Sequence, residues 1–105
     1  MENKFRKISF AGAKEILDNN PNAVLLDVRE EAEYITGHAV DAVLLPLREL
    51  DAASAAEAIP SHDTSVLVYC RSGRRSREAA LILAELGYNE VYDIGSLIGW
   101  PYGTE

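Results

Sequence analysis

The sequence predicts an α/β domain built on a mainly parallel central sheet of about five strands, with helices on both faces. Short aliphatic runs alternate along the chain with amphipathic helical stretches. These runs are apolar at successive positions, as in parallel strands that are covered on both faces. With 105 residues, the chain has the length of one compact domain, and we expect residues 1–105 to form a single domain.

The first half of the chain carries stop signals that separate its elements. Gly37 is expected to end a short helix because glycine tolerates the left-handed conformation beyond a helix end, and Pro60 is expected to close an alanine-rich helix. The predicted elements are a helix over residues 11–19, a strand over 23–27, a short helix over 30–36, a strand over 43–45 and a helix over 47–59.

The second half contains the clearest strand. Residues 65–69, Ser-Val-Leu-Val-Tyr, are predicted to form a buried strand, and Cys70 stands at its carboxyl end. An amphipathic helix is expected over residues 75–86, with Gly87 as its cap. A short strand over residues 90–93 precedes a turn-rich tail.

The charge and hydropathy patterns restrict the partners. A formal net charge of −7 argues against nucleic acid, whose phosphates require a basic surface. No apolar run approaches the roughly 20 residues that cross a bilayer, so we expect no membrane partner. The amino-terminal residues 1–7 show no signal-peptide pattern, which predicts a cytoplasmic location.

The basic residues are unevenly distributed. Four of the ten lie within eight positions that begin at Cys70, namely Arg71, Arg74, Arg75 and Arg77. This basic cluster in an acidic chain is where we expect an anion to bind. Cys70 is the only cysteine, which excludes an intramolecular disulfide, a CxxC redox pair and a cysteine-rich metal cage. We therefore expect no metal and no cofactor.

Cys70 has the sequence setting of a reactive thiolate. A strand, a cysteine, a short loop with glycine and arginine, and a helix amino terminus follow one another. Unpaired backbone N–H groups and the helix dipole at such a terminus attract negative charge, and neighbouring arginines add to this field. The alternative is an inert core cysteine. We expect the charged residues after Cys70 to keep it out of an apolar pocket, because burying unpaired charges is costly.

Residues 70–76, Cys-Arg-Ser-Gly-Arg-Arg-Ser, resemble the rhodanese active-site loop, in which an arginine follows the catalytic cysteine after four residues. The resemblance covers about residues 8–100 and includes Leu-Asp-Val-Arg at 26–29, Glu-Tyr at 33–34, Gly-His-Ala at 37–39, Pro46, Gly95 and Trp100. Asp41 and Ser96 stand where the family usually has glycine. Because of these two departures, the sequence does not determine the local turn geometry or the shape of the pocket rim.

The resemblance implies a sulfurtransferase that carries sulfur as a persulfide on Cys70. A small anionic donor such as thiosulfate would lose its outer sulfur to Cys70, and cyanide, a thiol or a thioredoxin-like protein would accept it. The family pattern implies that the substrate is bound by Arg71, Ser72, Gly73, Arg74, Arg75 and Ser76. Backbone N–H groups of these residues would hold the negative sulfur.

Other polar and aromatic residues are expected to support the fold. Asp27 and Arg29 have the spacing of an ion pair or loop anchor beside the site. His38 follows a helix-stopping glycine and is interpreted as a hydrogen-bonded structural residue rather than a general base. Tyr92, Trp100 and Tyr102 are expected in the core or at its rim.

Two alternative functions remain open at this point. A phosphatase or arsenate reductase also places a cysteine in an anion-binding loop, but its pattern has five residues before the arginine, and this chain has four between Cys70 and Arg75. A non-catalytic binding module with the same fold is the second alternative. The intact Cys70 loop favours the enzyme over both.

Overall fold

The computed structural model describes residues 5–105 of the chain. In chain order, the elements are β1 (Phe5–Lys7), α1 (Phe10–Asn19), β2 (Val24–Asp27), α2 (Glu31–Tyr34), β3 (Val43–Leu44), the 3₁₀ turn η1 (Leu47–Glu49), α3 (Ala52–Ala58), β4 (Ser65–Cys70), α4 (Arg74–Glu85) and β5 (Glu90–Ser96).

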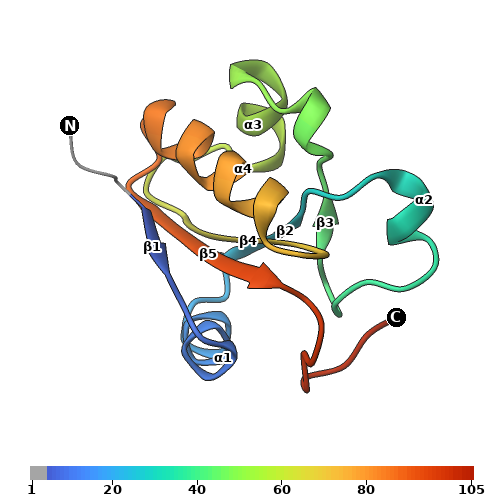
Figure 1. The fold of residues 1–105 in the computed structure, drawn as a ribbon. Helices are drawn as coiled ribbons and strands as arrows, with labels where there is room; N and C mark the ends of the chain where they lie inside the picture. Colours follow the sequence, from blue (N-terminus) through green and yellow to red (C-terminus); the bar gives the residue numbers. More distant parts are fainter. Residues whose placement is uncertain (1–4) are drawn as a thin grey trace.

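The strands form one parallel sheet in the order β1-β5-β4-β2-β3. Helices α3 and α4 cover one face of this sheet, and α1 covers the other (Figure 1). The predicted fold class, a mainly parallel sheet of about five strands between helices, is therefore confirmed. Strand β4 lies at the centre of the sheet, so its carboxyl end is enclosed by neighbouring strands on both sides.

The central strand explains why its residues are apolar at successive positions. Side chains alternate between the faces of a strand. Val66, Val68 and Cys70 belong to the buried layer that includes α4, whereas Leu67 and Tyr69 belong to the layer around Ala13 of α1. Because both faces are covered, every residue of β4 after Ser65 is buried.

The structure differs from the sequence-based expectation at three elements. The edge strand β1 was not predicted, because its three residues are partly or fully exposed and show no apolar pattern. The helix expected over residues 47–59 is interrupted, because Asp51 caps α3 by accepting a hydrogen bond from the Ser54 N–H at 2.8 Å. Strand β5 continues to Ser96, three residues beyond the predicted end, where it pairs with Cys70. No helix in residues 5–105 is long and apolar enough to cross a membrane.

Candidate active site

Cys70 ends β4 and is followed by a tight turn into α4. Gly73, the residue before the helix, has a φ of 96°, a left-handed conformation that favours glycine. The turn brings the helix start back over the cysteine. As a result, the Sγ atom of Cys70 accepts hydrogen bonds from the Gly73 N–H at 2.9 Å and from the Ser76 N–H at 3.3 Å.

The start of α4 concentrates hydrogen-bond donors around this sulfur. The first N–H groups of a helix have no partner within the helix, and the helix dipole makes this end positive. The Ser76 hydroxyl donates to the Gly73 carbonyl at 3.2 Å, which leaves the Ser76 N–H directed at Sγ. Backbone donors in such an arrangement stabilise negative charge on a sulfur atom.

The burial of Cys70 corrects one expectation from the sequence. Its side chain has no exposed surface and lies in an apolar layer with Val68 and Ala79. Contrary to the expectation from the charged residues after it, Cys70 lies in an apolar pocket, because Arg71 and Arg74 are exposed to solvent while the cysteine points inward. Burial alone fits an inert cysteine, but this sulfur also accepts hydrogen bonds from two backbone N–H groups.

The arginines of the loop divide into two kinds. Arg71 and Arg74 are exposed, and in residues 5–105 the side chain of neither forms an ion pair or a hydrogen bond. Arg75 instead donates to both carboxylate oxygens of Glu33 on α2, at 2.7 and 2.9 Å. The hydrogen bond with Arg75 lowers the pKa of Glu33 to about 2, and the same hydrogen bond raises the pKa of Arg75. Arg75 thus ties the start of α4 to α2.

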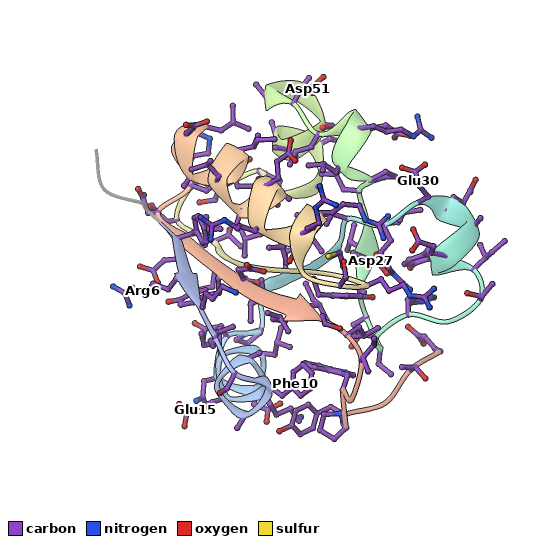
Figure 2. All side chains as sticks on the ribbon, viewed as in Figure 1. Arg6, Phe10, Glu15, Asp27, Glu30 and Asp51 are labelled. Carbon is purple, nitrogen blue, oxygen red and sulfur yellow. The ribbon has the colours of Figure 1, made fainter. Side chains whose placement is uncertain are left out.

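A buried ionic cluster lies at the end of β2, beside β4, with Asp27 at its centre; Asp27 is labelled in Figure 2. The carboxylate of Asp27 accepts from the Arg29 guanidinium, with its shortest contact at 2.6 Å, and from the Tyr69 hydroxyl at 2.6 Å. Arg29 also donates to the Gly37 carbonyl at 2.8 Å, and the Tyr69 oxygen accepts from the Ala39 N–H at 3.1 Å. Burial, followed by the hydrogen bond to Asp27, raises the pKa of Tyr69 well above its usual range.

The turn after α2 contains His38 and one of the two departures from glycine. His38 lies with Nδ1 at 2.9 Å from the Tyr34 carbonyl oxygen, and its ring stacks on Tyr34 with centroids 3.7 Å apart. Asp41 has a φ of 68°, so it keeps the left-handed conformation that glycine adopts easily. Its N–H donates to the Glu105 carboxylate at 3.0 Å. Asp41 thus has a conformation that glycine would adopt without strain.

Trp100 belongs to the layer around α1, on the opposite face of the sheet from the Cys70 side chain. Trp100 packs edge-to-face on Phe10 of α1 and on Tyr102, and it lines a cavity of about 380 Å³ with Lys14. A second cavity of about 340 Å³ lies at the Cys70 loop and is lined by Ser72, Arg74, Arg75 and Glu78. In residues 5–105, no cluster of three His, Cys, Asp or Glu side chains is arranged to hold a metal ion.

Two residues of the site were not recognised from the sequence. Glu33 braces Arg75, and the Ser96 hydroxyl donates to the Arg71 carbonyl. These contacts join residues that lie 42 and 25 positions apart. In the sequence, Glu33 stands out only as part of the family-like stretch at 33–34, and Ser96 only as a departure from the family's glycine. Neither spacing nor periodicity indicates such pairings.

Comparisons with known proteins agree with this geometry. The model of the family "Rhodanese-like domain" matches residues 9–100. The chain is 39% identical over 72 residues to the thiosulfate sulfurtransferase PspE of Escherichia coli, covering 69% of this chain and 68% of that protein. It is 35% identical over 85 residues to a sulfurtransferase of Allochromatium vinosum, covering 80% and 77%. A solved structure, "rhodanese with anions from E. coli", has 34% identity and a TM-score of 0.74, and the match covers 79% of this chain and 96% of the solved one.

Proposed function

This chain belongs to the rhodanese family of sulfurtransferases, and from that premise we propose that it moves a sulfane sulfur through a persulfide on Cys70. The proposed donor is thiosulfate or a persulfide, and the proposed acceptor is cyanide, a thiol or a thioredoxin-like protein. We place this activity in the cytoplasm and assign it to residues 1–105 as one domain.

The proposed reaction has two displacement steps. The Cys70 thiolate attacks the outer sulfur of thiosulfate, the S–S bond of the donor breaks, and sulfite leaves with the bonding electron pair. Cys70 then carries a persulfide anion. In the second step, the acceptor attacks the outer sulfur, and the Cys70 thiolate leaves. With cyanide as acceptor the product is thiocyanate, so atoms and electrons balance without a redox cofactor.

The observation that carries this proposal is the pair of backbone N–H donors from Gly73 and Ser76 at the Cys70 sulfur. Preorganised donors stabilise charge that develops during a reaction at no cost of reorganisation. Exposed Arg71 and Arg74 at the mouth of the loop would attract and orient an anionic donor. Beside this loop lies the cavity lined by Ser72, Arg74 and Arg75, where the anionic donor would bind.

The phosphatase alternative is disfavoured by Arg75. An arginine that grips phosphate uses its guanidinium as a two-pronged donor. Here both terminal nitrogens of Arg75 donate to Glu33. Four residues between Cys70 and Arg75, rather than five, also give a smaller ring of N–H groups.

Steady-state turnover tests the proposal. The protein is incubated with thiosulfate and cyanide, with thiocyanate as the readout, and in parallel with an activated aryl phosphate. We expect thiocyanate formation that Cys70→Ser abolishes, and no phosphate release. A variant with one glycine inserted between Ser72 and Gly73 is expected to lose most of the thiosulfate activity, since the widened ring no longer centres its donors on the sulfur. Phosphate release by the parent protein without thiocyanate formation would instead support the phosphatase.

A further inference from the structure

One hydroxyl connects the Cys70 loop to the turn after β5. The Ser96 hydroxyl donates a hydrogen bond to the Arg71 carbonyl, and its oxygen accepts one from the Ile98 N–H at 3.0 Å. Ser96 itself pairs with Cys70 across the sheet, and the Leu97 N–H donates to the Cys70 carbonyl at 3.0 Å. The Ser96 side chain therefore extends the pairing of β4 and β5 by one residue, into the loop.

The direction of this hydrogen bond determines the direction of the next N–H group. A trans peptide is planar, so its carbonyl and its N–H point in opposite directions. With the Arg71 carbonyl held by Ser96, the N–H of Ser72 points away from β5. In residues 5–105 this N–H donates no hydrogen bond to another residue, in contrast to the N–H groups of Gly73 and Ser76.

We propose that Ser96 is a positioning residue of this chain, whose hydroxyl fixes the Arg71–Ser72 peptide so that the Ser72 N–H faces the outer sulfur carried by Cys70. This inference rests on the proposed persulfide function. Without the hydroxyl, the peptide can rotate and turn the Arg71 carbonyl towards the anionic sulfur. A carbonyl oxygen repels negative charge, so the same rotation both removes a donor and adds a repulsive dipole.

The Cys70 loop lies within van der Waals distance of the end of β5, where Ser96 is located. The position where a Cβ of Gly73 would stand is only 3.8 Å from the Gly95 Cα and 3.9 Å from the Ser96 backbone nitrogen. The loop therefore passes directly over the end of β5. The other end of the loop is braced by Arg75 and Glu33, so Ser96 restrains the end that Glu33 does not reach.

The test compares Ser96→Ala with Ser96→Thr, which keeps a hydroxyl. The control is Ser61→Ala, whose hydroxyl oxygen accepts a hydrogen bond from the Asp63 N–H in the segment that leads into β4, at the opposite end of the strand from Cys70. In the thiosulfate:cyanide reaction, we expect Ser96→Ala to lower kcat about five-fold, as the loss of one hydrogen bond to the transition state would do, with a smaller change in KM. Ser96→Thr should restore most of the activity, and Ser61→Ala should match the parent protein.

A second readout separates this inference from the proposed function. Alkylation of Cys70 by iodoacetamide requires no persulfide, and a loop released at Arg71 should expose the buried sulfur more often. We expect Ser96→Ala to be alkylated several-fold faster than the parent and than Ser61→Ala. If the parent forms no persulfide, the proposed function fails while the alkylation ratio still decides the role of Ser96. A kcat at or above the parent value, or an unchanged alkylation rate, would overturn the proposal.

Discussion

The neighbouring strands β2 and β4 end side by side, and their ends are built differently. At the end of β2, Asp27 is buried and accepts hydrogen bonds from Arg29 and Tyr69. At the end of β4, Cys70 is equally buried, but the donors around its sulfur belong to the backbone of the following turn. The first end contains paired charges, whereas Arg71 and Arg74 beside the second have no side-chain partner among residues 5–105, and only Arg75 there is paired, with Glu33.

The two strand ends are therefore expected to have different roles, with the end of β2 stabilising the fold and the end of β4 binding an anion. Both carboxylate oxygens of Asp27 are already bonded to groups of the fold, including the Arg29 backbone N–H, which leaves little capacity for a ligand. Backbone donors and unpaired arginines keep that capacity. The comparison predicts that changes at the β2 end mainly affect folding, and that changes at the β4 end mainly affect turnover.

The largest stability effect is expected at Asp27. Asp27→Ala leaves the guanidinium of Arg29, which is only 8% exposed, without its carboxylate. Breaking a buried pair in this way costs about 3–5 kcal/mol. Urea unfolding measures the loss. Asp18→Ala removes an exposed pair with Lys14 and should change stability by less than about 0.5 kcal/mol. Equal effects of the two substitutions would refute the structural role of the Asp27 cluster.

At the exposed arginines of the Cys70 loop, we expect a smaller effect, and we expect it on substrate binding instead of stability. Arg71→Ala and Arg74→Ala should each raise KM for thiosulfate roughly ten-fold, because they remove a cation that attracts the donor. Their thermal midpoints should barely move, since both side chains are exposed. Arg6→Ala provides a matched control on the edge strand β1, which β5 separates from β4 (Figure 2). Parallel losses of stability and binding would assign these arginines a structural role.

The Glu33–Arg75 pair is expected to contribute about 1 kcal/mol to the free energy of unfolding, as is typical of a partly exposed ion pair, and this contribution depends on pH. The pKa of Glu33 is lowered in the folded protein from 4.5 to about 2. Its stabilising contribution is therefore complete above pH 4.5 and is lost as the pH falls towards 2. Unfolding measured across this range should show a shallower slope for Glu33→Gln than for the parent and for Glu31→Gln, a control on the same helix. Identical slopes would show that the pair contributes nothing.

The smallest effect is expected at Asp93, which contrasts with Asp27. It is 1% exposed on β5, and in residues 5–105 neither of its carboxylate oxygens has a hydrogen-bond partner. Replacing an unbonded polar group with an apolar one of similar size removes its desolvation cost. We expect Asp93→Leu to leave stability within about 1 kcal/mol of the parent or to raise it, as measured by urea unfolding. A loss above about 2 kcal/mol would show that Asp93 forms an essential interaction.

Local patterns in the sequence were sufficient to predict the main elements. The continuous apolar run before Cys70 predicts β4 to within one residue, and the glycine after α4 has the expected left-handed φ, 102° at Gly87. The edge strand β1 could not be predicted, because only its pairing with β5 makes its residues a strand. Such pairing depends on residues about 86 positions away, as between Phe5 and Val91.

The part of the site that is contiguous in the sequence could also be predicted from local patterns. Cys70 and its loop are contiguous, so the order of strand, cysteine, glycine and helix is visible in the sequence. The braces of that loop, Glu33 and Ser96, come from other elements and require the fold. The inward direction of Cys70 was missed because neighbouring residues in a turn can point to opposite sides, which the charge pattern does not reveal.

The most direct test of the account is the mass of the intact protein after incubation with thiosulfate and then with cyanide. The reaction scheme predicts that thiosulfate adds the mass of one sulfur atom, that cyanide removes it, and that Cys70→Ser shows no change at either step. Because Cys70 is the only cysteine, the added mass can be assigned without further mapping. A parent protein that gains no sulfur from thiosulfate or from a persulfide donor, or a Cys70→Ser variant that gains it equally, would contradict the proposal that Cys70 carries the sulfur.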